Sequence, residues 1–155
     1  MTQTQPPSSD SLDPLSLSGY ELLMAMARGE FPPAPISETI GMSGFGGEEG
    51  SIWVELVPEP RHYNPLGTVH GGVISTLLDT AAACSVHSTL APGEGYTSLD
   101  LTVKFLKPVT VDSGLLRATG SVLQRGRRTA LAQAQLHDAQ GRLVAHATSS
   151  CMIFS

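Results

Sequence analysis

Apolar residues run together over residues 70–90 and alternate with polar residues in most of the segments around them. The apolar run begins at His70 or Gly71, contains one acidic residue, Asp79, and is followed by Pro92 and Gly93. A run longer than a strand and bounded by glycine and proline predicts a long, almost wholly apolar helix over residues 70–90. A carboxylate in such a helix costs free energy unless it has a partner or a function, so Asp79 needs an explanation.

The segments on either side of this helix have the period of two that is typical of strands. The connections between the last strands are short and contain Gly or Asp, which implies antiparallel neighbours. The sequence therefore predicts an α+β domain in which an antiparallel sheet of five to six strands surrounds the long helix. The predicted strands span residues 39–44, 51–57, 96–106, 115–124, 129–137 and 142–154.

The first part of the chain differs from the rest in composition. Residues 1–15 are rich in Ser, Thr and Pro and poor in bulky apolar residues, which predicts a disordered tail. Apolar positions at helical spacing over residues 17–28 predict a short amphipathic helix, ended by Gly29 and the prolines that follow. We expect residues 16–35 to form this helix and a linker, and residues 36–155 to form the main domain.

Composition and charge exclude several classes of function. The 155 residues, 41% of them hydrophobic, are enough for one ordinary core. No apolar run reaches a membrane span, and the N-terminus has no signal-peptide pattern, so we expect a soluble cytoplasmic protein without a membrane partner. Cys84 and Cys151 lack metal-ligand spacing, and the histidines add none, so we expect buried thiols, no metal site and no cofactor.

The net charge of −5 is unevenly distributed. Residues 1–60 carry −8 and the remainder carries +3, including Arg125, Arg127 and Arg128 within four positions. These three arginines could anchor a phosphorylated ligand, or they could be the solvated charges of a hairpin. Because there is no long basic stripe and aromatic residues make up 5% of the chain, we do not expect nucleic acid as a partner.

The helix N-terminus and Asp79 together fit the hydrolysis of an activated acyl group. That reaction needs a positioned water or carboxylate nucleophile and a donor for the oxyanion that forms on the carbonyl. Asp79 can serve as general base or nucleophile. The N–H of Gly71 can serve as the oxyanion donor, because the first N–H groups of a helix have no intrahelical acceptor. The structural alternatives are that Asp79 accepts a hydrogen bond from the hydroxyl of Ser75 or Thr76 one turn back, and that Gly71 and Gly72 allow close packing of the helix.

Helix geometry keeps these two groups apart within one chain. Eight residues at about 1.5 Å each place Gly71 and Asp79 about 12 Å from one another, whereas both must lie within roughly 3–3.5 Å of the reacting atoms. Two antiparallel helices related by a two-fold axis would bring Gly71 of one subunit near Asp79 of the other. The spacing therefore predicts a homodimer with two equal sites.

The pattern Asn-Pro-x-Gly-Thr-x-His-Gly-Gly over residues 64–72, with Asp79 eight residues after the first paired glycine, resembles the hotdog-fold acyl-CoA thioesterases of the phenylacetate-degradation type. Residues 97–108 and 138–145 are also similar to that family. The resemblance covers the chain from about residue 36 onwards. It implies a hotdog fold, an acyl-CoA substrate, and a dimer that places the thioester at its interface, with pairing into a homotetramer expected.

The resemblance also implies roles for further residues of the motif. The side-chain amide of Asn64 would give a second hydrogen bond to the thioester carbonyl, and Ser98 would hold the water together with Asp79. His70 would orient the loop or contact the ligand beside Gly72, and Thr97 would face the other side of the sheet. The alternatives are that Asn64 only braces its loop and that Ser98 is an ordinary sheet hydroxyl.

Three functions remain open on this basis. Hydrolysis of acyl-CoA to free acid and CoA is the expected one, with the acyl group, aromatic or aliphatic, left unspecified. A hotdog hydratase or dehydratase would use His70 and Asp79 as its acid–base pair. A non-catalytic acyl-CoA-binding module would not need Asp79, which is present.

Overall fold

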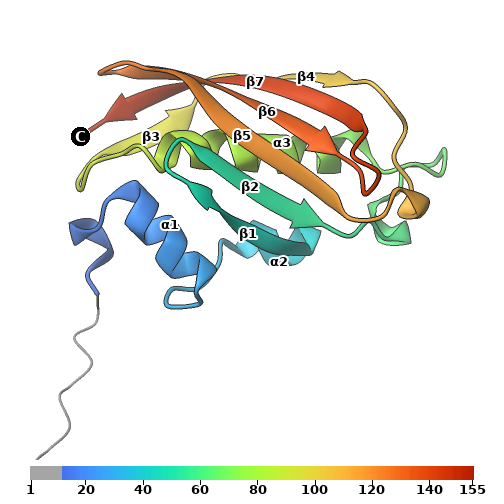
Figure 1. The fold of residues 1–155 in the computed structure, drawn as a ribbon, viewed down its shortest axis with the longest axis horizontal. Coiled ribbons are helices and arrows are strands. Elements are labelled where there is room, and N and C mark those ends of the chain that lie inside the picture. The colour runs from blue at the N-terminus through green and yellow to red at the C-terminus, as the bar shows by residue number, and fades with distance from the viewer. Residues whose placement is uncertain (1–11) are drawn as a thin grey trace, which may run out of the picture.

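A seven-stranded antiparallel sheet and one long helix make up most of the structure (Figure 1). The computed structural model describes residues 12–155, so the predicted tail lies mostly in residues 1–11, outside the described part. The sheet order is β1-β2-β5-β6-β7-β3, and β4 also pairs with β7, on the same edge as β3. The strands are β1 (Met42–Glu48), β2 (Ser51–Leu56), β3 (Gly95–Ser98), β4 (Thr102–Phe105), β5 (Leu116–Arg125), β6 (Thr129–His137) and β7 (Leu143–Phe154).

The long helix α3 (Gly71–His87) runs along one face of this sheet (Figure 1). Its buried side chains, which include Leu77, Leu78 and Ala81, pack against the alternating inward residues of the strands, such as Val54 and Leu136. A Cβ atom at Gly120 in β5 would collide with the carbonyl oxygen of Ala81, so only glycine allows the helix to lie this close to the sheet. The predicted α+β class and the buried central helix are confirmed.

The N-terminal elements cover the edge of the sheet at β1 (Figure 1). Helix α1 (Gly19–Ala27) confirms the predicted short helix, and its capping box joins Ser18 and Glu21. The Gly19 N–H donates to the Leu90 carbonyl at 2.9 Å, and the Tyr20 hydroxyl donates to the Gly47 carbonyl at 3.2 Å. These bonds fix α1 to the end of α3 and to the β1–β2 turn. The division of the chain at residues 15 and 35 stays a prediction.

Two details of the predicted sheet are wrong. The run over residues 96–106 is two strands, β3 and β4, which raises the count from the predicted five or six to seven. Between them Asp100 leaves the ladder, because its carboxylate accepts the Ser150 N–H at 2.8 Å and its carbonyl accepts the Ser149 hydroxyl at 3.0 Å.

The second error concerns the strand predicted over residues 39–44. Residues up to Ile40 form a helix, α2 (Pro35–Ile40), and β1 starts only at Met42. Pro35 in the first turn favours a helix start, and Gly41, with φ of 84°, ends it in a left-handed conformation. Six residues are too few for the periodicity to reveal a helix.

Three single turns of 3-10 helix complete the described elements: η1 (Pro14–Ser16), η2 (Pro60–His62) and η3 (Val111–Ser113). Within residues 12–155, none of the helices has both the length and the apolar character needed to span a bilayer.

Candidate active site

The loop that leads into α3 is folded around the side chain of Asn64. Its Oδ1 accepts the N–H groups of Leu66 at 2.9 Å and Thr68 at 3.3 Å, and its Nδ2 donates to the Thr68 hydroxyl at 2.9 Å. Asn64 therefore does brace its loop, as one of the two sequence interpretations has it. The second hydrogen of Nδ2 has no acceptor among residues 12–155, so bracing leaves one donor available.

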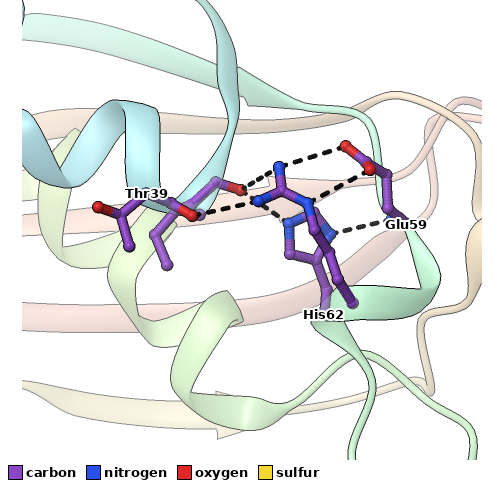
Figure 2. A network of polar contacts seen from close by, with 5 residues as sticks. Thr39, Glu59 and His62 are labelled. Atoms are coloured by element: carbon purple, nitrogen blue, oxygen red, sulfur yellow. Dashed lines mark hydrogen bonds and ion pairs between the residues drawn. The ribbon is translucent and has the colours of Figure 1, made fainter.

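A buried histidine holds the chain immediately before this loop (Figure 2). His62 Nδ1 accepts the Glu59 N–H at 2.9 Å, and Nε2 lies 2.7 Å from the Ile40 carbonyl. Arg61 pairs with the Glu59 carboxylate at 3.3 Å and donates to the Thr39 carbonyl at 3.3 Å. This network ties η2 to the end of α2 and so fixes where the Asn64 loop begins. The sequence pattern gave His62 no role, because its partners are backbone groups 3 and 22 residues away.

His70 caps the N-terminus of α3. Its Nδ1 accepts the Gly72 N–H at 2.8 Å, so the ring proton is on Nε2, and its own N–H donates to the His62 carbonyl at 2.8 Å. The cap occupies the Gly72 N–H. The Gly71 N–H has no acceptor within residues 12–155, which leaves it free for an oxyanion.

Gly71 and Asn64 line the same pocket, which has a volume of about 340 Å³. The ring of Phe105 lies against Gly71, because a Cβ atom there would come within 3.0 Å of the ring. Lys107 adds a cationic side chain to the same wall. Neither Phe105 nor Lys107 was predicted as a site residue, since both lie on a segment remote in sequence from the glycine pair.

The carboxylate of Asp79 is half-buried and incompletely paired. Its Oδ1 is buried and has no hydrogen-bond partner in the described part of the chain. Burial raises the pKa of Asp79 above that of an ordinary aspartate, and the neighbouring side chain of Ser98 offsets part of the shift. The hydroxyls of Ser75 and Thr76 donate to the carbonyls of Gly71 and Gly72 at 2.7 and 2.8 Å, so the alternative that Asp79 bonds to them is wrong.

Ser98 is at the end of β3, where the strand passes Asp79. Because successive side chains of a strand alternate between its two faces, its neighbour Thr97 in β3 belongs to the opposite face. Two residues not predicted as site residues lie in the same environment. Burial and the nearby charge of Asp79 raise the pKa of the Cys84 thiol to about 12, and burial together with neighbouring groups raises the pKa of Tyr96. Tyr96 could have been found from its position two residues before Ser98 on one strand face.

The structure thus forms two half-sites. Asn64, Gly71 and His70 meet at the N-terminus of α3, while Asp79 and Ser98 meet near its middle. The helix is continuous between them, so eight residues still correspond to about 12 Å along the axis. The first half-site carries an N–H group without an acceptor in the described residues, and the second carries a carboxylate with a raised pKa.

The three arginines near the β5–β6 turn differ in their contacts. Arg125 pairs with Glu94 at 2.8 Å and donates to the Thr89 hydroxyl at 3.1 Å, which ties β5 to the segment after α3. Arg127 and Arg128 are exposed and form no ion pair within residues 12–155. Among those same residues, no group of three or more His, Cys, Asp or Glu side chains is placed to hold a metal ion.

Comparison with known proteins places this arrangement in a family. The sequence model of the thioesterase superfamily matches residues 66–145, just over half of the chain and the whole of α3. The chain belongs to the thioesterase superfamily. Human acyl-coenzyme A thioesterase 13 is similar to this thioesterase, with 29% identity over 97 residues that make up 62% of this chain and 68% of the human protein. The 1,4-dihydroxy-2-naphthoyl-CoA hydrolase of Listeria monocytogenes is 27% identical over 70% of this chain and 87% of that protein.

Solved structures agree on the fold. A phenylacetic acid degradation-related protein of Ralstonia eutropha JMP134 is 33% identical, with a TM-score of 0.76 over 84% of this chain and 98% of that chain. The PaaI protein of Escherichia coli, from the phenylacetic acid degradation operon, has a TM-score of 0.76 at 23% identity over 91% of this chain and 96% of its own. The hotdog fold and the phenylacetate-degradation type of thioesterase, both expected from the sequence, are confirmed.

Proposed function

We propose that this chain hydrolyses acyl-CoA thioesters to a free acid and CoA, with Asp79 as the group that activates the attack. The observation that carries the proposal is the half-buried carboxylate of Asp79, whose Oδ1 lacks a partner among residues 12–155 and whose pKa is raised. A partly buried carboxylate with a raised pKa and an oxygen without a hydrogen-bond partner is available to accept a proton or to attack an electrophile. An oxygen that lacks a partner contributes no structural hydrogen bond. The names of the similar human and Listeria proteins supply the CoA ester as substrate class.

The chemistry follows from the groups at the two half-sites. With Asp79 as general base, a water held by Asp79 and Ser98 gives its proton to the carboxylate as its oxygen attacks the thioester carbonyl carbon. The negative charge on the carbonyl oxygen is stabilised by the Gly71 N–H and the free hydrogen of Asn64 Nδ2. The C–S bond then breaks, and the CoA thiolate takes the proton from Asp79. As nucleophile, Asp79 would attack the carbonyl carbon and form an anhydride with the acyl group as the C–S bond breaks and CoA leaves as a thiolate. Water then cleaves the anhydride to the free acid and restores the carboxylate.

The proposed site needs two copies of the chain. The donors at Gly71 and the base at Asp79 are about 12 Å apart on one rigid helix, too far to act on one carbonyl. An antiparallel pair of α3 helices about a two-fold axis would unite the Gly71 end of one protomer with Asp79 of its partner, giving two equal sites per dimer. A tetramer of two such dimers is compatible with this arrangement.

Hydrolysis is favoured over hydration by the state of His70. A hydratase would need His70 and Asp79 as an acid–base pair at neighbouring carbons. In this structure His70 Nδ1 already accepts the Gly72 N–H as the helix cap, so that ring nitrogen is held by a structural bond and is not free to act as a base. Arg127 and Arg128 are exposed and are available to bind the phosphates of CoA, whereas Arg125 is already neutralised by Glu94.

The test is thiol release from a panel of acyl-CoA esters. Wild type should liberate CoA from at least one ester, and Asp79→Asn should be at least about 100-fold slower, in line with the loss of a general base. Asp112→Asn, an exposed aspartate in η3, is the matched control and should keep the wild-type rate. Hydration of an enoyl-CoA without thiol release, or binding of acyl-CoA without any turnover, would contradict the proposal.

A further inference from the structure

A second pocket, of about 300 Å³, lies under the N-terminal helix. Its walls come from four parts of the chain: Leu23 and Met26 on α1, residues 33–37 at the start of α2, Met42 and Phe45 on β1, and Thr80 and Cys84 on α3. None of the described residues that line it is charged. The Thr80 hydroxyl is satisfied within the helix, since it donates to the Thr76 carbonyl at 2.7 Å. The pocket is therefore suited to an apolar ligand rather than to phosphate or sugar.

This pocket reaches the stretch of α3 that carries Asp79. Thr80 directly follows Asp79 in α3, and Cys84 lies close enough for the charge of Asp79 to affect its thiol. An acyl group whose carbonyl is attacked beside Asp79 therefore has an apolar recess within reach.

Helix α1 forms the outer wall of the pocket, and close contacts fix its position. The first residue of α1 is in such close contact with the end of α3 that a Cβ atom at Gly19 would collide with the His87 carbonyl. Leu23 is buried, and Tyr20 anchors the helix to Gly47. The wall is also outside the segment shared with the family model, which starts at residue 66. The selectivity of this chain for the acyl group can therefore differ from that of other family members that share the segment from residue 66 onwards.

We infer that the pocket beneath α1 receives the acyl group of the thioester, and that α1 limits the length of chain the enzyme accepts. The inference rests on the proposed function and deepens it. A volume of about 300 Å³ is at the small end of the range for small-molecule sites, roughly 300–1,000 Å³. The preferred substrates are therefore CoA esters of short to medium apolar acids, and chains of palmitoyl length exceed the pocket.

The experiment changes the volume of the pocket from α1 and follows kcat/KM across straight-chain acyl-CoA esters from acetyl to palmitoyl. Ala27→Leu fills the pocket, and Met26→Ala enlarges it. Met24→Ala is the matched control: the residue is on the same helix but lines a different hollow. Far-ultraviolet circular dichroism and the melting temperature verify that each variant is folded.

Filling the pocket should shift the optimum to shorter esters, with kcat/KM for the longest wild-type substrate falling by roughly 10-fold or more while that for acetyl-CoA stays within about 2-fold. Met26→Ala should shift the optimum to longer esters, and Met24→Ala should leave the profile unchanged. An active wild type whose chain-length profile is the same in all three variants overturns this inference and leaves the proposed function standing. A wild type that hydrolyses no acyl-CoA overturns both.

Discussion

Replacing Asp79 with asparagine should make the protein more stable while it removes activity. The substitution keeps the size and shape of the side chain and removes its charge. Asp79 Oδ1 is buried without a partner in the described residues, and the neighbouring Ser98 side chain offsets only part of the effect of desolvation on the pKa. A purely structural aspartate would behave in the opposite way, because its loss would break a stabilising bond.

The gain in stability of Asp79→Asn can be estimated from the burial of the carboxylate. Leaving a buried polar group unsatisfied costs about 1–3 kcal/mol, and more for a charged group. Because the Asp79 side chain is only partly buried and solvent screens it, we take the low end and expect the free energy of unfolding to rise by about 1 kcal/mol at pH 7. For a chain of this size that corresponds to about 2–4 °C in melting temperature.

The gain should also depend on pH in a defined direction. A raised pKa means that the folded protein favours the protonated acid, so wild type loses stability as the pH rises from the ordinary aspartate value, about 3.9, through the raised value. Asparagine has no such loss. The advantage of Asp79→Asn is therefore full at pH 7 and disappears below about pH 4.

Thermal unfolding of wild type, Asp79→Asn and the Asp112→Asn control at both pH values measures this difference, alongside thiol release at pH 7. The control should change stability by less than about 0.5 kcal/mol. If Asp79→Asn loses both stability and activity, Asp79 is a structural residue. If it retains the wild-type turnover, Asp79 is not the group that activates the attack.

Three further predictions concern the rest of the site. Ser98→Ala should raise the pKa of Asp79 further and shift the acidic limb of the pH profile of kcat/KM to higher pH; an unmoved limb would mean that Ser98 does not act on Asp79. The double change Arg127→Ala and Arg128→Ala should raise KM for CoA esters more than it changes kcat, whereas equal effects on a short thioester without the CoA phosphates would rule out a phosphate contact. Gly71→Pro should lower kcat by about 100-fold or more through loss of one N–H donor. Gly71→Ala keeps the donor, so its kcat should remain well above that of Gly71→Pro.

The fold could be predicted wherever one element had a long, unambiguous pattern. The 17 residues of α3 and the nine of β6 were recognisable because periodicity accumulates over that length. The six-residue helix α2 gave too short a pattern. The break at Asp100 depends on bonds to Ser149 and Ser150, about fifty residues away, which no local pattern reports.

The candidate site, like the fold, could be predicted only in part from the sequence. Asp79 and Gly71 were visible because a lone acid and a glycine pair stand out against an apolar helix, and Ser98 followed from the family resemblance. The pairing of Arg125 with Glu94 and the wall that α1 provides are products of tertiary packing. Charge clusters in a sequence do not reveal which members are already neutralised by a partner.

The most direct test of the shared site is complementation between two inactive variants. Gly71→Pro removes the Gly71 N–H donor and keeps the backbone conformation, because proline is favoured in the first turn of a helix and His70, with φ of −59° and ψ of 136°, already has the backbone conformation that a following proline requires. The Phe105 ring must shift slightly to admit the proline Cβ atom. Asp79→Asn removes the base. Equal amounts of the two variants are unfolded together and refolded, so that their chains pair at random.

If each site takes Gly71 from one protomer and Asp79 from its partner, half of the refolded dimers are mixed, and each mixed dimer has one intact site of two. The mixture should then recover about a quarter of the wild-type turnover, while each variant refolded alone stays inactive. A mixture no more active than its parents, from chains that do form mixed dimers, would contradict a site shared between two protomers.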